Sequence, residues 1–229
     1  MTTTTNTSVS TAQNAGQLST EILNKLFGDS ALSFDLKQGT VRSTTDTRVI
    51  YLSSDIIRGI YDVLKYETGD AWSLILKNCG IIWGERISAS LDNEILATTS
   101  QKMGQLSVDS FIHLLEAYFA NHGWGKMKFY LDDADSNGIV RANLKNSLFA
   151  ETLKHLNSPI EFMIAGMLQG IFSAISGHDL SCLQVGYEST GNESSEFLIS
   201  AKFRMDAFEQ SGFAQELAPN EALARLRFT

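Results

Sequence analysis

The chain has 229 residues, 43% of them hydrophobic, and a formal net charge of −8. This length suits one domain with a substantial core. The Lys and Arg residues are scattered, which argues against nucleic acid and against an anionic membrane surface as partners. No apolar run in the sequence reaches the ~18 residues that a membrane span requires.

The first residues predict a disordered tail. Residues 1–15 are nearly all Thr, Ser, Asn and Gln, and such a segment cannot bury enough apolar surface to offset its ordering entropy. We therefore expect a tail at 1–15 and a single domain at 16–229. The tail lacks the apolar core of a signal peptide and the arginines of a transit peptide. Cys79 and Cys182 both have apolar neighbours, which predicts reduced core thiols in a cytoplasmic protein.

The first half of the chain predicts mainly helices. In chain order the expected elements are a short helix closed by Gly28, strands at 32–36 and 49–52, and helices at 54–64, 72–91 and 108–121. Gly80 and Gly84 lie four residues apart in the long helix at 72–91.

The second half predicts two hairpins around one apolar helix. The expected strands are 124–131, 138–144, 180–187 and 196–203, the last two joined by a turn at Gly191 and Asn192. Asn157, Ser158 and Pro159 predict the start of a helix at 160–175. In that helix Gly166 and Gly170 would let another backbone come close. A peripheral helix is expected after Asp206. The order predicts an α+β fold, an antiparallel sheet with helices packed on one side.

One stretch matches the opening of a calcium loop. Asp133, Asp135, Asn137 and Gly138 fit its first positions, but Leu144 stands where the bidentate glutamate belongs. The competing interpretation, which we favour, is a hairpin turn ending in Asn-Gly. Gly123-Trp124-Gly125 lacks the third glycine of a nucleotide fingerprint.

The four histidines do not form a metal pattern, because none has another His or Cys at ligand spacing. His122 and His178 fall at predicted helix ends, where imidazole often caps carbonyls. His113 lies within an amphipathic helix, and it is the histidine that we expect to face a cavity. Cys79 has no basic partner nearby in the sequence, which argues against a nucleophile there.

Residues 69–203 resemble the 4-vinyl-reductase domain family in the order of their features. The shared features are the spaced glycines Gly80 and Gly84, the opening Gly123-Trp124-Gly125, Asn157-Ser158-Pro159, the pair Gly166 and Gly170, and the last hairpin with Gly191 and Phe197. The family includes sensor domains of aromatic-responsive transcription activators, and its fold is similar to that of vesicle-tethering subunits. The resemblance implies a dimer that holds a small hydrophobic ligand between helices and sheet.

Many family members carry a metal-binding pattern in the last hairpin, with one Glu and two Cys. Aligning Gly191 and Phe197 with that pattern places Gln184, Tyr187 and Ser195 at the ligand positions. These groups hold zinc poorly, so we expect no structural zinc and a hairpin held by hydrogen bonds and packing.

The resemblance also implies a setting and a ligand. Stand-alone domains of this family occur in photosynthetic bacteria, including cyanobacteria. It therefore implies a non-catalytic homodimer that holds a tetrapyrrole or a precursor and supports pigment metabolism or photosystem assembly, with assembly factors as partners. The protein would lie in the cytoplasm or at the thylakoid surface. Two alternatives stay open: a 4-vinyl (divinyl chlorophyllide) reductase, and an assembly scaffold with a filled core. No catalytic residue is assigned.

A ligand, if held, is expected among the helices at 70–91, 108–121 and 160–176 and the strand after Trp124. Its predicted walls are Trp83, Phe111, His113, Trp124 and Met163. His113 is the expected polar contact. An aromatic-walled void of about 300 Å³ or more would favour binding over a scaffold.

Overall fold

The computed structural model describes residues 18, 20–28, 31–43, 45–212 and 217–228. The predicted tail at 1–15 lies outside them. By its internal contacts the chain divides into two compact units. Unit 1 comprises residues 1–49 and 91–117, and unit 2 comprises residues 50–90 and 118–229. The expectation of a single domain at 16–229 stays a prediction.

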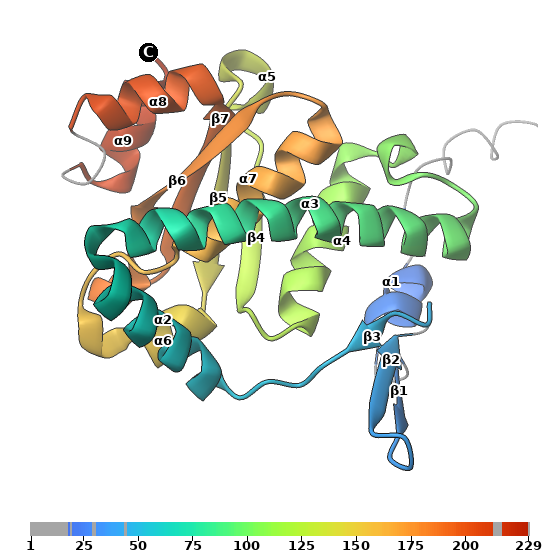
Figure 1. Cartoon of the computed structure of the whole chain (residues 1–229). Helices are drawn as coiled ribbons and strands as arrows, with labels where there is room; N and C mark the ends of the chain where they lie inside the picture. Colours follow the sequence, from blue (N-terminus) through green and yellow to red (C-terminus); the bar gives the residue numbers. More distant parts are fainter. Residues whose placement is uncertain (1–17, 19, 29–30, 44, 213–216, 229) are drawn as a thin grey trace, which may run out of the picture. The chain divides into compact units, whose positions relative to one another are not determined.

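Unit 1 joins a small sheet to helical segments (Figure 1). It contains α1 (Thr20–Phe27), β1 (Leu32–Asp35), β2 (Thr40–Ser43), β3 (Arg48–Val49), the end of α3 (Trp72–Thr99) and most of α4 (Val108–Asn121). The three strands pair antiparallel in the order β1-β2-β3. The predicted helix before Gly28, the first strand and the helix at 108–121 are confirmed. The strand predicted at 49–52 corresponds to β3, which comprises only Arg48–Val49. β2 was not predicted.

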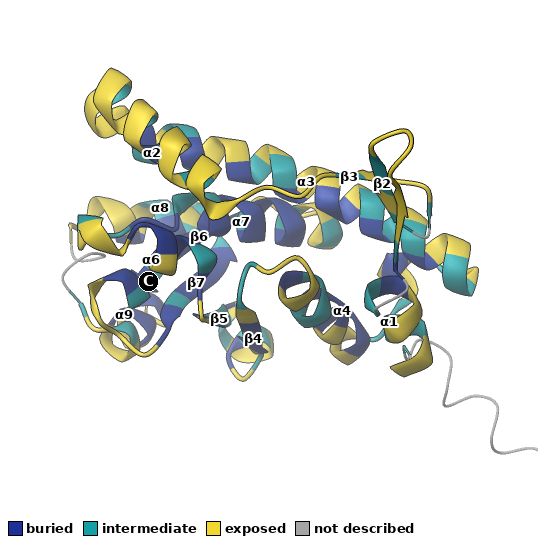
Figure 2. Ribbon diagram, turned by 90° about the horizontal axis from the view of Figure 1, so that it is seen from below, coloured by how far each residue is buried: buried dark blue, intermediate teal, exposed yellow. Residues whose placement is uncertain are grey.

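The helices of unit 2 begin with α2 (Ser54–Thr68), a 3-10 turn at Gly69–Ala71 and the first part of α3. Ser53 caps α2 by accepting a hydrogen bond from the Asp55 backbone N–H, as short polar side chains do at helix starts. α7 (Phe162–Ser176) is the apolar helix, and it is buried over most of its length, whereas α2 is largely exposed (Figure 2). α7 starts later than predicted, because Asn157 adopts a left-handed conformation that ends a short 3-10 helix at Lys154–Leu156.

The paired glycines bring α3 and α7 into backbone contact. A Cβ on Gly80 or Gly84 would overlap the carbonyl oxygen of Met163 or Met167. A Cβ on Gly166 or Gly170 would overlap a carbonyl oxygen of α3, that of Lys77 or Ile81. The close approach predicted from the Gly166 and Gly170 spacing is therefore confirmed, and the other glycine pair completes it reciprocally.

The sheet of unit 2 has four antiparallel strands in the order β4-β5-β7-β6. They are β4 (Lys126–Tyr130), β5 (Val140–Lys145), β6 (Leu180–Gly186) and β7 (Ser195–Ala201), close to the predicted strands. Phe129 on β4 contacts Phe172 on α7, with ring centroids 5.5 Å apart. Ala142, Phe197 and Gln184 follow Phe129 across the register. They share its face, since side chains alternate along strands.

The other face of β6 and β7 is covered by α8 (Lys202–Gln210) and α9 (Pro219–Leu226). Leu183, Val185 and Leu198 pack there in one cluster with Met205 and Phe208 of α8 and with Ala222, Leu223 and Leu226 of α9. The α+β class and the antiparallel sheet are confirmed. In addition, the edge strand β6 lies between a helix layer on each face.

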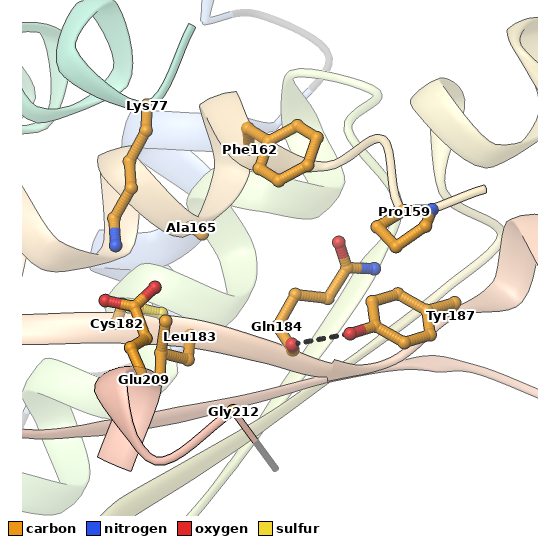
Figure 3. A pocket seen from close by; sticks show the side chains of 10 residues that line it. All are labelled: Lys77, Pro159, Phe162, Ala165, Cys182, Leu183, Gln184, Tyr187, Glu209 and Gly212. Atoms are coloured by element: carbon orange, nitrogen blue, oxygen red, sulfur yellow. Dashed lines mark hydrogen bonds between the residues drawn. The ribbon is translucent and has the colours of Figure 1, made fainter. Parts of the chain in front are cut away.

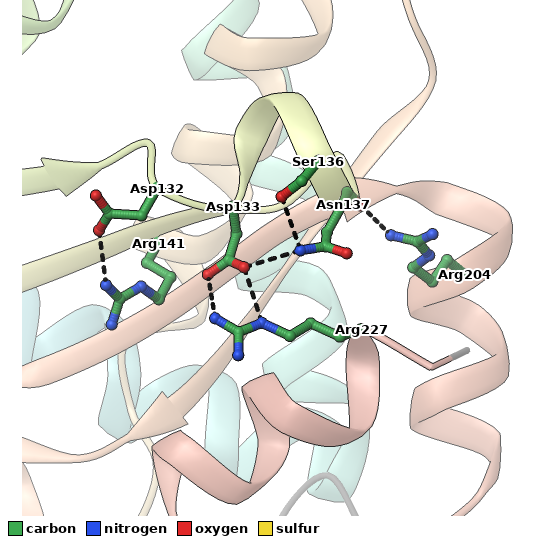
Figure 4. A network of polar contacts seen from close by, with 7 residues as sticks. All are labelled: Asp132, Asp133, Ser136, Asn137, Arg141, Arg204 and Arg227. Carbon is green, nitrogen blue, oxygen red and sulfur yellow. Dashed lines mark hydrogen bonds and ion pairs between the residues drawn. The ribbon is translucent and has the colours of Figure 1, made fainter.

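The link between β4 and β5 contains one helical turn, α5 (Ala134–Asn137), closed by left-handed Gly138. Asp133 accepts two hydrogen bonds of 2.8 Å from Arg227, and the Asn137 amide donates to it at 3.0 Å (Figure 4). These bonds lower the pKa of Asp133, with Arg227 as the main cause. The hairpin is confirmed, but Asn137-Gly138 ends a helical turn, and an arginine takes the carboxylate that a calcium loop would need.

None of the helices in the described ranges is both long enough and apolar enough to cross a membrane.

Candidate functional site

Unit 2 contains a pocket of about 360 Å³ beside the edge strand β6 (Figure 3). Its lining residues are Lys77, Pro159, Phe162, Ala165, Cys182, Leu183, Gln184, Tyr187, Glu209 and Gly212. They come from α3, the first turns of α7 and the segment before it, β6 and the residue after it, and the end of α8 with the turn beyond it. The pocket lies at this edge because helices cover both faces of β6. Its volume falls within the range of small-molecule sites.

The walls of the pocket are mostly apolar. Phe162 stands over one side, and Pro159 and Tyr187 close one end (Figure 3). Ala165 projects from the next turn of α7, where its small side chain leaves the space open. An apolar molecule would bury its surface here, which is the main source of affinity in such sites.

Gln184, one of the lining residues, also belongs to a cluster of polar side chains around Glu161, which is 0% exposed. The Gln184 amide donates to one Glu161 oxygen at 2.5 Å, and Ser147 donates to the other. The backbone N–H of Glu161 donates in turn to Gln184 Oε1 at 3.3 Å. The cluster therefore ties the segment before α7 to β6 and to the N-cap of α6 (Leu148–Thr152).

Burial raises the pKa of Glu161 to about 7, and the negative charge of Glu188 adds to the rise. Hydrogen bonds from Ser147, Ser195 and Gln184 act in the opposite direction. A carboxyl group out of water prefers its neutral form unless it is paired with a cation. No described cation is bonded to Glu161, so its carboxyl group changes charge near neutral pH.

The three positions aligned with the family's zinc pattern meet at this cluster. Gln184 bonds Glu161, the Tyr187 hydroxyl donates to the Gln184 carbonyl at 3.1 Å, and Ser195 Oγ accepts from the Glu188 N–H at 3.1 Å. The hairpin is held by hydrogen bonds, as predicted. Within the described ranges no group of three or more His, Cys, Asp or Glu is placed to hold a metal ion.

The two cysteines differ from each other. Cys182 is 0% exposed, and burial raises the pKa of its thiol to about 12, which makes it a poor nucleophile. The prediction of a core thiol is confirmed for Cys182. It is wrong for Cys79, which is exposed, because Cys79 lies on the outward side of α3.

Two predicted wall residues, Trp83 and Trp124, meet in unit 2. Their rings pack edge to face with centroids 5.1 Å apart. The indole N–H of Trp124 is buried and has no hydrogen-bond partner among the described residues. Neither ring lines the pocket beside β6.

An array of aromatic rings connects these tryptophans to the pocket wall. Successive ring centroids are 5.1–5.9 Å apart in the order Trp83, Trp124, Phe149, Tyr61, Trp72, Phe162. Distances of this kind are typical of favourable aromatic pairs. The array reaches the pocket at Phe162, whose ring lies over one side of it.

The other predicted wall residues lie elsewhere. Phe111 is buried and His113 is exposed, both on the part of α4 that belongs to unit 1. Met163 is half-buried on α7 and touches α3 through its backbone at Gly80. The sequence did not point to two residues of the site. Lys77 lines the pocket, and Glu161 bonds to the lining residue Gln184. Glu161 had a signal, since it is the only charged residue between 160 and 176.

No family model matches the sequence, and comparison with curated proteins finds no match. Solved structures do match. The phenol-responsive sensory domain of the transcription activator PoxR, solved with phenol, is similar with a TM-score of 0.63 and 16% identity over 90% of this chain and 96% of that one.

Two further structures show weaker similarity. A vinyl-4-reductase family protein from Methanocaldococcus jannaschii gives a TM-score of 0.45 at 17% identity over 66% of this chain and 83% of that one. A trafficking protein particle complex subunit 3 from Naegleria fowleri, covalently bound to palmitic acid, gives a TM-score of 0.47. It is 15% identical over 65% of this chain and 95% of that one. The PoxR comparison shows a shared fold: this chain has the α+β fold of that sensory domain.

Proposed function

We propose that the chain is a non-catalytic binding protein for a small hydrophobic molecule, held in the pocket beside β6. The observation that carries this proposal is the pocket of about 360 Å³ with Phe162 and Tyr187 in its walls. It exceeds the void of about 300 Å³ that would favour binding over a scaffold with a filled core. The fold shared with a phenol-responsive sensory domain supports it further.

The size of the pocket favours ligands of one or two rings. A tetrapyrrole, which the family resemblance implied, has four pyrrole rings and would need a larger volume than about 360 Å³. We therefore propose a monocyclic or bicyclic aromatic molecule, which includes pyrrole-type precursors of pigments. A role in pigment metabolism or photosystem assembly, a homodimer and a place in the cytoplasm are finer proposals that rest on the resemblance. Sedimentation velocity would test the dimer.

Calorimetric titration of the purified protein with phenol and with larger aromatic compounds tests the binding proposal. The blocking variant is Ala165→Leu, whose longer side chain would extend into the pocket. We expect at least one compound to bind the wild type, and Ala165→Leu to weaken that binding by about tenfold or more, a loss of ~1.4 kcal/mol.

The matched control is Ala207→Leu, which makes the same change at an exposed position on α8 outside the pocket lining. Its affinity should equal that of the wild type. A panel of aromatic compounds without any binding, or binding that Ala165→Leu leaves intact, would contradict the proposal.

A further inference from the structure

Two charged side chains stand at one end of the pocket, opposite Pro159 and Tyr187 (Figure 3). Lys77 reaches in from α3 and is half-buried, and Glu209 reaches from α8 and is exposed. Both act on the thiol of Cys182, with opposite effects on its pKa. Neither side chain makes a hydrogen bond or an ion pair with another described residue.

The side chains of Gln184 and Tyr187, which also line the pocket, already form hydrogen bonds within the protein. The Gln184 amide donates to Glu161 and to the Gly186 carbonyl, and its oxygen accepts from the Glu161 N–H. The Tyr187 hydroxyl donates to the Gln184 carbonyl at 3.1 Å. Lys77 is therefore the lining group whose donors are open to a ligand.

The backbone of Lys77 is fixed in place. Its carbonyl oxygen lies against Gly166, at the point where α3 and α7 touch. Its side chain has no hydrogen-bond or ion-pair partner among the described residues, although the exposed Glu209 stands at the same end of the pocket. An anionic group on a ligand would supply both the charge and the hydrogen-bond acceptors.

We propose that the pocket selects an apolar acid, with its carboxylate on Lys77 and its ring between Phe162, Pro159 and Tyr187. This inference rests on the proposed binding function and adds the chemical class of the ligand. Glu209 competes with that carboxylate for Lys77 and repels it. Because Glu209 is exposed, solvent screens its charge more strongly than it screens the attraction between Lys77 and the carboxylate of the ligand.

A matched pair of probes tests the charge preference. 3-Phenylpropanoate and 3-phenylpropan-1-ol have the same ring and chain and differ in the head group, and the acid is ionised at pH 7.5. We expect calorimetric titration of the wild type to give about tenfold tighter binding of the acid, as a charge-assisted hydrogen bond provides.

The variants separate the two charges. Lys77→Met should lower the affinity for the acid to that for the alcohol and leave the alcohol unchanged, while Lys77→Arg should retain the preference. Glu209→Gln should tighten acid binding about two- to threefold, because it removes a competitor that is largely screened. Lys154→Met is the matched control, since Lys154 is exposed in the same unit and does not line the pocket. It should behave as the wild type.

The outcomes distinguish this inference from the proposed function. Equal affinities of acid and alcohol for the wild type, or a preference for the acid that survives in Lys77→Met, would overturn the inference and leave hydrophobic binding intact. If Lys77→Met does not fold, an acid preference unchanged in Glu209→Gln counts against the inference. If neither probe nor any other aromatic compound binds the wild type, the proposed binding function is wrong, and the inference is wrong with it.

Discussion

Glu161 connects the pocket to the polar interior of unit 2. It is completely buried, and the residues that bond it, Ser147 and Gln184, come from two other elements. Phe162, the aromatic wall, is its neighbour in the chain. The charge state of one carboxyl group therefore bears on the segment that positions the wall.

Glu161 makes stability depend on pH. Its pKa is about 7 in the folded protein against a reference value of 4.5. Between these values the folded state holds a proton that the unfolded state has released, so stability falls as pH rises from about 4.5 to about 7. The penalty above this window is on the order of 3 kcal/mol. Glu161→Gln removes the titration, and its free energy of unfolding should decline less over this window in urea titrations.

The pH dependence of the unfolding free energy must be compared between the wild type and Glu161→Gln, because burial also raises the pKa of Glu94 and of Glu196. Their contributions cancel in the difference between wild type and Glu161→Gln. Two parallel pH profiles would show that the pKa of Glu161 is not raised.

Tyr61 provides a second buried polar contact near the start of α7. It is 1% exposed, and its hydroxyl donates to the Ile160 carbonyl at 2.6 Å. Tyr61→Phe should cost about 1–2 kcal/mol in urea unfolding, because a buried acceptor loses its donor. Tyr66→Phe on the same helix is the control, since Tyr66 is 86% exposed, and it should change stability by less than ~0.5 kcal/mol. Equal effects of the two substitutions would rule out the buried bond as the cause.

Single residues were the hardest part to predict from the sequence. Aligning Gln184, Tyr187 and Ser195 with the metal-binding pattern of the family that the sequence resembles predicted a hairpin held by hydrogen bonds, and the structure contains such bonds. The same alignment could not show that Glu161, more than 20 residues earlier, bonds to this hairpin. Lys77 faces the pocket only because of the direction in which α3 crosses α7, and periodicity does not contain that angle.

Between elements, the contact of α3 with α7 depends on four glycines. Gly166→Ala would place a methyl group on the Lys77 carbonyl oxygen and force the two helices apart. Overpacking of this kind costs about 1–3 kcal/mol, and the higher helix propensity of alanine offsets less than ~1 kcal/mol of it. Thermal and urea unfolding would measure the loss.

Gly59→Ala is the matched control for this helix contact. Gly59 is exposed on α2, and a Cβ there would have no atom within 4 Å. The substitution should be neutral or stabilise by about 0.5–1 kcal/mol. If Gly166→Ala behaved in the same way, α3 and α7 would not be in backbone contact.

Elements with a strong local pattern were predictable from the sequence. The helix at 108–121 and the two hairpins of unit 2 follow from periodicity and turn residues. A peripheral helix was expected after Asp206, but the cover of α8 and α9 on the second face of β6 and β7 was missed, because the pattern within a helix does not show which face of a sheet that helix packs on. That cover is needed for the site, since the pocket lies at the edge of β6 between α7 on one face and α8 on the other.

At the scale of the whole molecule, fold and site carry different information. The chain shares its fold with the PoxR sensory domain over 90% of its length at 16% identity. A shared fold at such identity does not transfer a ligand, since function depends on the residues of the site. The proposed ligand class therefore rests on this chain's own pocket, with its apolar walls and the unpaired ammonium of Lys77.

Occupation of the pocket should stabilise the folded protein. A ligand that binds only the folded state adds RT ln(1 + [L]/Kd), about 2.7 kcal/mol at a concentration of 100 Kd. For a chain of this size that free energy corresponds to a rise in Tm of about 5–10 °C. Differential scanning calorimetry should show this rise with 3-phenylpropanoate for the wild type and for Ala207→Leu. At the same concentration the rise for Ala165→Leu should be at most about half as large, because tenfold weaker binding leaves about 1.4 kcal/mol. An equal rise in all three proteins would place the ligand outside the pocket beside β6.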